Sequence, residues 1–324
     1  MNNLLDLLLE ANDTTKRREL TEYINSNPKE FESLLEVVFD PDEEGYSQEK
    51  QRILDLVDFL SPRLAMSIIE RTIDDNDPCV RTRGLQATYR GQFNSLNSKI
   101  LMLLQDKEEP FDVRKWAIHI LGSTDPTGFA RYLRRIVRDS DEDTEIRKEA
   151  IFALTNSPSD PTIGALCMLL GDSNVEVRRA GAWALGRVES EDTINCLLAA
   201  LEDNDEFVRD WAIRGLRDSD NTRALQGLAD AMTSTEPLFQ QQLIRHVIEK
   251  KSEIILRAVV ELLEAEDVAV RRLAAWAMGV SPYPPAASQL EKLLDDEDEQ
   301  VRTYAKKALE RLGRIDPSEF GLIL

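Results

Sequence analysis

The sequence predicts an all-α fold, an α-solenoid in which about ten helical hairpins stack into one superhelix. Three observations predict it: a Val-Arg pair that recurs at nearly constant intervals, a polar capping residue three positions before the pair, and a small residue four positions after the Val. Because the repeats run through most of the 324 residues, one long domain is expected where a chain of this length would otherwise form two.

The Val-Arg pair sets the register of the repeats. It occurs, with Ile for Val in one repeat, at Val80-Arg81, Val113-Arg114, Ile146-Arg147, Val177-Arg178, Val208-Arg209, Val270-Arg271 and Val301-Arg302. The steps are 33, 33, 31, 31, 62 and 31 residues, and Phe239-Gln240 divides the double step into two of 31. A period of 31–33 residues accommodates two short helices and two turns.

Each repeat is expected to hold two amphipathic helices joined by a polar turn. In the repeat around Val208, apolar residues recur at helical spacing in 193–201 and again in 207–216. Asp205 precedes Val208 by three residues, where a carboxylate caps the first N–H groups of a helix. The same position holds Asp77, Asp143, Asn174, Glu236, Asp267 and Asp298. The small residues that follow are expected where helices of neighbouring repeats approach closely, and they are Gly84, Ala117, Ala150, Gly181, Ala212, Ala274 and Ala305.

The repeats divide the chain into three parts. Residues 1–62 form two degenerate, acidic N-terminal capping repeats, residues 63–313 form eight regular repeats continuous with them, and residues 314–324 form a C-terminal tail. The N-terminal part carries 15 acidic and 6 basic residues, with the densest acidic run in 40–45. It is expected to be a solubilising cap; the alternative is a surface that meets a basic protein.

The best-formed repeats resemble a known family. The pattern Asp-x-x-Val-Arg-x-x-Ala-x-x-Ala-Leu-Gly, clearest in 174–186 and 267–279, is similar to the HEAT repeat in the short form named after phycobilisome lyases. The resemblance implies a solenoid of helical hairpins. It says little about function, because the family includes scaffolds, adaptors, lyase subunits and a few enzymes.

The resemblance also implies a ladder between an acidic residue of the turn and the arginine of the following helix. Its expected pairs are Asp172 with Arg178, Asp203 with Arg209, and Asp296 with Arg302. Such charge-assisted hydrogen bonds explain the periodic arginines without a ligand, the alternative being a stripe that binds anions.

The repeat at 220–250 departs from this pattern. It has Ser234 for the turn acid, Gln240 for the arginine and Leu243 for the small residue. One interpretation of this change is structural, namely drift, local repacking or a hinge. The alternative is selection for a partner that binds at Gln242, Arg245 and His246.

Aromatic residues recur three or six positions after the signature residue, on the side of the second helix that flanks the core. The set consists of Trp116, Phe152, Trp183, Trp211, Trp276 and Tyr304. Packing between repeats explains them; alternatively, Trp116, Trp183, Trp211 and Trp276 form binding hot spots on a concave face.

Composition narrows the function classes. The net charge of −20 argues against nucleic-acid binding, and no segment approaches the apolar length of a membrane span. Three cysteines, Cys79, Cys167 and Cys196, are too few and too scattered for a disulfide framework or a zinc site, which favours a reduced, cytoplasmic setting.

Catalysis and cofactors are not expected. The two histidines, His119 and His246, lack the His-Glu pairs with which the HEAT-like deoxyhypusine hydroxylases bind iron, and no phosphate-binding loop or nucleophile motif occurs. We therefore expect no metal and no cofactor.

The sequence favours a non-catalytic scaffold or adaptor that holds another protein or a peptide on its concave face. The alternative is a chromophore-lyase-type subunit or maturation factor. A HEAT-like enzyme that binds nucleic acid is the third and least favoured interpretation.

Overall fold

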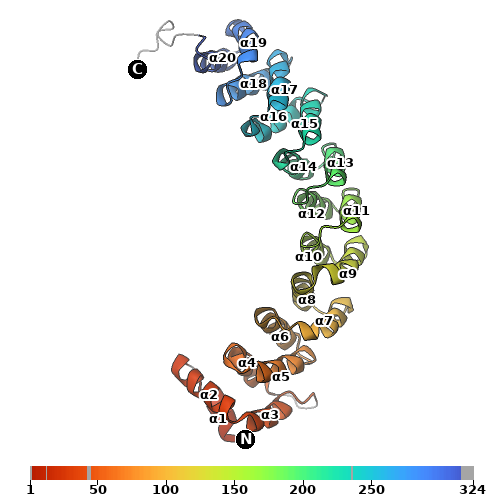
Figure 1. Cartoon of the computed structure of the whole chain (residues 1–324), viewed down its shortest axis with the longest axis vertical. Helices are drawn as coiled ribbons and strands as arrows, with labels where there is room; N and C mark the ends of the chain where they lie inside the picture. Colours follow the sequence, from red (N-terminus) through yellow and green to blue (C-terminus); the bar gives the residue numbers. More distant parts are fainter. Residues whose placement is uncertain (1, 12, 42–44, 235, 315–324) are drawn as a thin grey trace. The chain divides into compact units, whose positions relative to one another are not determined.

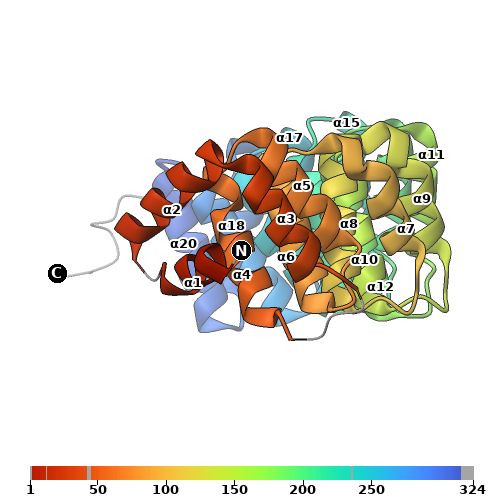
Figure 2. The same ribbon diagram turned by 90° about the horizontal axis from the view of Figure 1, so that it is seen from below.

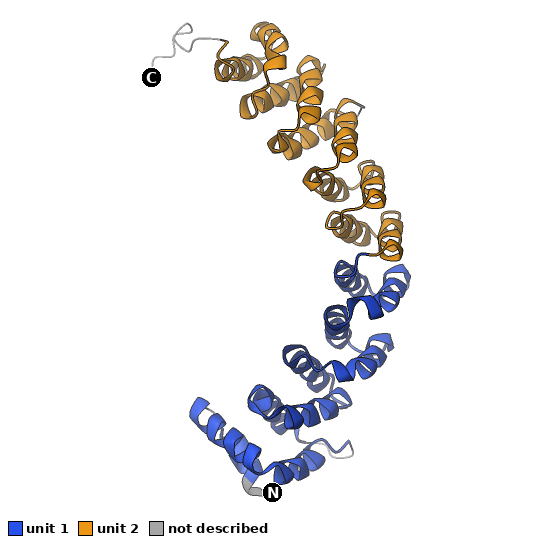
Figure 3. Ribbon diagram, in the orientation of Figure 1, with its two compact units in different colours: residues 1–158 blue, residues 159–324 orange. Residues whose placement is uncertain are grey.

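The computed structural model describes residues 2–11, 13–41, 45–234 and 236–314. The acidic residues 42–44 and positions 315–324 of the predicted tail lie outside the described residues. The chain consists of two compact units, residues 1–158 and 159–324, coloured separately in Figure 3. The domain boundaries expected at residues 62 and 313 stay predictions.

Both units are built of short helices, numbered along the chain in Figure 1. The first unit contains α1 (Asn2–Glu10), α2 (Thr14–Ser26), α3 (Pro28–Val38), α4 (Ser47–Leu56), α5 (Pro62–Ile73), α6 (Pro78–Gly91), α7 (Asn97–Gln105), α8 (Phe111–Thr124), α9 (Pro126–Arg138) and α10 (Thr144–Leu154). The second contains α11 (Asp160–Leu169), α12 (Val175–Leu185), α13 (Glu191–Ala200), α14 (Glu206–Asp218), α15 (Thr222–Ser234), α16 (Pro237–Val247), α17 (Glu253–Glu261), α18 (Val268–Val280), α19 (Ala287–Lys292) and α20 (Glu299–Arg311). No strand occurs among the described residues, and the predicted all-α solenoid is confirmed.

Within each unit the helices form two layers, seen from the side in Figure 1 and from below in Figure 2. The second helices of consecutive repeats pack side by side, as α6 does on α8 and α8 on α10, or α14 on α16 and α16 on α18. The first helices form the other layer, in which α11 packs on α13 and α13 on α15. Below we call these the second-helix face and the first-helix layer.

The predicted caps start the second helices. The Asp205 carboxylate accepts hydrogen bonds from the N–H groups of Phe207 and Val208, at 3.1 and 3.0 Å. The equivalent side chains that cap their helices are Asp77, Asp143, Asn174, Asp267 and Asp298. Glu236 is the exception, because its side chain makes no capping hydrogen bond to α16.

The signature residues form the core between the layers. Val177, Val208 and Val270 are fully buried. A Cβ atom on Gly181 would lie 3.1 Å from the Cβ of Leu169 on the paired helix, closer than ordinary van der Waals contact. The small residue therefore lets the two helices of one repeat approach each other. The pattern predicted this close approach between neighbouring repeats, and at Gly181 that prediction was wrong.

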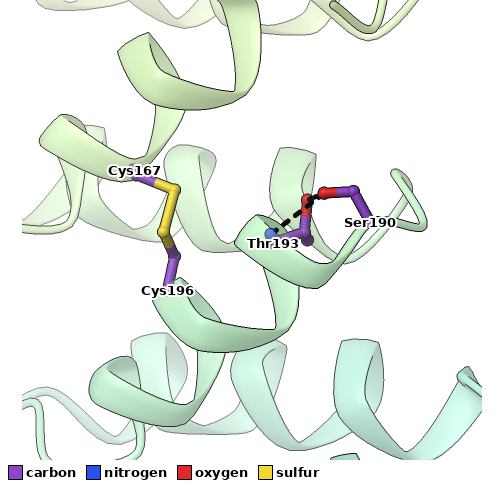
Figure 4. The surroundings of a disulfide bond; sticks show 4 residues. All are labelled: Cys167, Ser190, Thr193 and Cys196. Carbon is purple, nitrogen blue, oxygen red and sulfur yellow. Dashed lines mark hydrogen bonds between the residues drawn. A yellow bond between two sulfur atoms is a disulfide. The ribbon is translucent and has the colours of Figure 1, made fainter. Parts of the chain in front are cut away.

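The two later cysteines correct the sequence analysis. A disulfide joins Cys167 of α11 to Cys196 of α13, as Figure 4 shows, and leaves Cys79 free and exposed. The expectation that the cysteines are too scattered for such a bond was wrong for this pair. Their separation of 29 residues is close to one repeat, so stacking brings them onto adjacent first helices. In the same view, the Ser190 hydroxyl accepts a hydrogen bond from the N–H of Thr193 and caps α13.

Candidate partner-binding surface

The arginine ladder exists, but its ion pairs differ from those expected. Arg178 donates to both oxygens of Asp203, at 2.9 and 3.2 Å, and to the backbone oxygen of Asp172, at 3.0 Å. Arg209 and Arg302 likewise donate to the backbone oxygens of Asp203 and Asp296. In the three expected pairs the arginine thus contacts the backbone of the turn, and for Arg178 the carboxylate partner comes from the following repeat.

Turn geometry explains this difference. The Asp203 carboxylate also accepts the N–H of Asp205, two residues on, at 2.8 Å, so its own turn fixes its direction. The same arrangement recurs at Asp296, which pairs with Arg271 at 2.8 Å. Burial alone would raise the pKa of Asp296, but the hydrogen bonds from Arg271 and from the backbone N–H of Asp298 hold that pKa below its ordinary value.

The first unit contains the most buried step of the ladder. Arg114 makes two parallel hydrogen bonds of 2.7 Å to Glu142, and both side chains are about 5% exposed. The Arg114 guanidinium lowers the pKa of the Glu142 carboxyl. In this unit the partner carboxylates of Arg81 and Arg114 are Glu109 and Glu142, one position after the acids that the register had indicated.

The irregular repeat leaves one step incomplete. The Nε of Arg209 is buried and has no hydrogen-bond partner among the described residues, while its guanidinium lies over the Phe239 ring, 5.3 Å from the centroid. In the irregular repeat itself, Gln240 stands where other repeats have the ladder arginine. It donates to the backbone oxygen of Met232 at 2.9 Å, so it replaces a backbone contact of that arginine but not its ion pair. The substitutions at Ser234 and Gln240 thus remove ion pairs on both sides of the repeat.

Trp116 belongs to an aromatic cluster on the second-helix face of the first unit. Its ring lies between those of Tyr89, at 5.9 Å, and His119, at 5.6 Å. His119 Nε2 and Lys115 Nζ contact the Glu149 carboxylate, at 2.9 and 2.8 Å. Burial would raise the pKa of Glu149, but these two partners lower it overall.

Trp211 and His246 belong to one cluster of the second unit. The Arg214 guanidinium lies over the Trp211 ring at 5.3 Å and pairs with Asp210 at 2.7 Å. His246 Nε2 of the next second helix contacts Asp210 at 2.6 Å. Burial, together with nearby arginines, lowers the pKa of His246, against the opposite effect of Asp210. Trp183 of α12 is half-buried, and the guanidinium of Arg187, in the turn after that helix, lies 5.2 Å from its ring centroid.

Arg245 and Trp276, both predicted site residues, line one cavity on the second-helix face. It has a volume of about 230 Å³, and its lining residues are Gln241, Arg245, Ala269, Arg272, Leu273, Trp276 and Tyr304. Arg245 is exposed and has no ion pair among the described residues, whereas Arg272 pairs with Asp298 at 2.9 Å. Gln242 lies outside this cavity and donates to the backbone oxygen of Glu206 at 3.4 Å.

The sequence analysis missed part of this cavity. Gln241 and Leu273 carry no periodic signal, because the equivalent positions of the other repeats hold different residue types. The cavity depends on α16, α18 and α20 meeting at Tyr304, and only the three-dimensional packing shows that meeting.

Two classes of feature are not found in the described residues. Among the helices of this part of the chain, none is both long and apolar enough to cross a membrane. Within the same residues, no group of three or more His, Cys, Asp or Glu side chains is arranged to hold a metal ion. The expectation of no metal and no cofactor stays a prediction.

The repeats match a family model. The model for HEAT repeats matches residues 136–217, 164–242 and 225–310, which together span more than half of the chain. The chain belongs to the HEAT-repeat family. The finer resemblance to the phycobilisome-lyase form of the repeat stays a prediction. No curated protein matches the sequence.

Solved HEAT-repeat structures share the fold. Yeast importin-β (Kap95p) is 14% identical, with a TM-score of 0.58 over 98% of this chain and 52% of its own. A structure of Kap95p with RanGDP gives 13% identity and a TM-score of 0.57, over 96% of this chain and 49% of that chain. The chain thus spans about half the length of these importins, and at such identities the likeness shows the fold alone.

Proposed function

We propose that this HEAT-repeat chain is a non-catalytic scaffold that binds a segment of a partner protein on the second-helix face of residues 159–324. The anchor is the cavity between Arg245 and Trp276. The sequence analysis expects this face to be the concave one, and the proposal keeps that expectation.

The cavity is the observation that carries the proposal. It places an unpaired cation, Arg245, beside the half-buried rings of Trp276 and Tyr304 and the side chain of Leu273. Tryptophan and arginine are the residue types most enriched in binding hot spots, where an apolar pocket excludes water from a charged contact. A partner segment with an apolar side chain next to a carboxylate would match both features.

The structural neighbours support a protein partner in general terms. Kap95p, which shares the fold, binds RanGDP. A rigid stack of helices offers a long preformed surface, so a partner loses entropy on binding but the scaffold loses little.

The test compares two arginines of one unit. After the partner is captured with the intact chain and identified, its affinity is measured by calorimetry for Arg245→Ala and for Arg257→Ala. Arg257 is a matched control because it is exposed on α17, in the first-helix layer, where it pairs with Glu253 of its own helix and hydrogen-bonds Tyr283. We expect Arg245→Ala to weaken binding at least tenfold, about 1.4 kcal/mol, and Arg257→Ala to leave it unchanged.

Thermal unfolding separates binding from packing. Arg245 is exposed, so its truncation leaves the unfolding temperature unchanged if the proposal is correct. Equal affinities for the two variants would contradict the cavity as the anchor. Loss of binding on charge reversal of Asp42, Glu43 and Glu44 instead would assign recognition to the acidic N-terminal part.

We also propose a cytoplasmic location, which the disulfide puts to a test. Cytoplasmic thiols are kept reduced, whereas a lasting bond between Cys167 and Cys196 is typical of an oxidising compartment. Rapid alkylation of thiols in the native cells, followed by mass spectrometry, should label Cys79, Cys167 and Cys196 alike. Labelling of Cys79 alone would contradict the cytoplasmic location.

A further inference from the structure

Helix α9, in the first-helix layer of the first unit, carries a stripe of exposed arginines. Arg131, Arg135 and Arg138 are spaced at i, i+4 and i+7, which places them on one side of the helix, and all three are exposed. We call them the arginine stripe. The helix contains no acidic residue, although the chain has 60 acidic and 40 basic residues.

The stripe is unusual because its cations lack carboxylate partners. Helix α6 provides the contrast: it holds three arginines and no acid, but Arg81, Arg83 and Arg90 pair with Glu109, Asp55 and Asp58, at 2.7, 2.5 and 3.1 Å. In the stripe, none of the three makes an ion pair among the described residues. Arg131 contacts the Tyr132 ring, 4.5 Å from its centroid, and hydrogen-bonds the Tyr132 hydroxyl.

A polar cavity of about 320 Å³ adjoins the stripe at Arg135. Its other charged groups are already paired with one another, Arg114 with Glu142 and Lys107 with Asp139 at 2.8 Å. Arg135 and the Tyr132 hydroxyl complete its lining. Arg135 is therefore the cation of this cavity that is available to an incoming anion.

The position of α9 excludes insertion into a bilayer. Its apolar residues Ala130, Leu133 and Val137 are buried in the core of the unit, so no apolar face is left for lipid. A net charge of −20 repels every polyanion at long range, an acidic peptide included, so the stripe must act through short-range contacts. Neighbouring charges about 5–6 Å apart along a helix suit carboxylates on alternate residues of an extended peptide.

We infer that the arginine stripe docks an acidic segment of a partner protein, whose carboxylates pair with Arg131, Arg135 and Arg138. Three unpaired like charges on successive turns repel one another and weaken the helix, and a bound acidic segment removes that repulsion. The site lies in the first-helix layer of residues 1–158 and is independent of the cavity at Trp276.

The test uses the full chain and a fluorescein-labelled peptide of alternating glutamate and serine, with its glutamine analogue as the uncharged control. The stripe variant carries Arg131→Gln, Arg135→Gln and Arg138→Gln. The matched control carries Arg223→Gln, Arg257→Gln and Lys292→Gln, three exposed cations of the first-helix layer of the second unit, each paired with an acid. Both variants lose the same charge.

We expect the glutamate peptide, and not its glutamine analogue, to bind the unmodified chain, and the stripe variant to bind it at least tenfold more weakly. The control variant should stay within about twofold, and the unfolding temperature of the stripe variant should not fall. Equal losses in both variants would assign binding to net charge and overturn the inference. So would the absence of binding at about 1 mM peptide. Tighter stripe-dependent binding of single-stranded DNA, or of vesicles containing phosphatidylserine, would replace the acidic segment with another class of partner.

Discussion

Two steps of the arginine ladder in the second unit have opposite outcomes. Arg271 has a carboxylate partner in the following repeat, Asp296. Arg271 also donates to the backbone oxygen of Ala265, and Asp296 accepts a hydrogen bond from the N–H of Asp298. Arg209 has the same backbone contact but a buried Nε without a partner, because the following repeat has Ser234 in the register of Asp296. The difference teaches that a ladder step belongs to two repeats, so a substitution in one leaves its neighbour unsatisfied.

The caps repeat the contrast. Asp205 and Asp298 cap α14 and α20 and pair with Arg179 and Arg272 of the preceding repeats, at 2.7 and 2.9 Å. Glu236, in the same register, does neither among the described residues. The irregular repeat therefore lacks this cap and its ion pair, while His246 still contacts Asp210 of the preceding repeat and the apolar core, including Leu243 and Ile244, is kept.

The largest effect is expected at the most buried complete step. Arg114→Met leaves the Glu142 carboxylate buried without its partner, and we expect the free energy of unfolding, measured in urea, to fall by about 3–5 kcal/mol. Adding Glu142→Leu should recover most of this loss, because the double variant contains no unpaired charge. A loss below about 1 kcal/mol would show that water compensates the carboxylate.

A smaller effect is expected at Asp203, which is more exposed. Asp203→Ala removes the partner of Arg178 and the acceptor for the N–H of Asp205, and should cost about 1–2 kcal/mol in the same measurement. Asp203→Asn keeps the turn hydrogen bond and should cost less. If the two substitutions cost the same, the ion pair would be the whole contribution and the turn none of it.

Acid should destabilise the folded chain over a defined pH range, in which the Asp205 carboxylate becomes protonated. The hydrogen bond from Arg179, together with those from the N–H groups of Val208 and Phe207, lowers the pKa of Asp205 from 3.8 to about 2. The folded state thus binds the proton less readily, so the stabilisation is fully present above pH 3.8 and is lost as the pH falls to about 2. Urea unfolding across this range should show a shallower dependence on pH for Asp205→Asn. An unchanged slope would contradict the assignment.

The smallest effect should be a gain. Ser234→Asp restores the acid in the register that pairs with the preceding arginine, and should stabilise the chain by about 0.5–1 kcal/mol through Arg209. The same substitution in an Arg209→Met background should give no gain. A gain in both backgrounds would mean that the new carboxylate acts on its own turn and not across the ladder.

Local periodicity predicted what each repeat does by itself. Val208 at the core and Asp205 at the cap follow from spacing along one helix, and the structure confirms both. The close approach at Gly181 lies within one repeat and not, as expected, between neighbouring repeats. Spacing along the chain cannot show which repeat supplies a partner. Arg178 lies 6 residues from Asp172 and 25 from Asp203, and the turn geometry that selects Asp203 emerges only in three dimensions.

The candidate sites were predicted less completely. Arg245 and Trp276 share a cavity, as expected for residues on second helices that pack side by side. Tyr304 completes the cavity from a third helix. The arginine stripe is visible in the sequence as 131–138, yet its importance depends on the absence of ion pairs, which needs side-chain positions.

The bond between Cys167 and Cys196 has a mechanical consequence. The helices between them, above all α12 with Trp183, lie inside a closed covalent loop of 29 residues. When the two ends of the chain are pulled apart, this loop cannot extend, so about 100 Å of contour length, at roughly 3.5 Å per residue, is withheld until the bond is reduced. Under tension the second-helix face at Trp183 would then be the part of the scaffold that keeps its local shape longest.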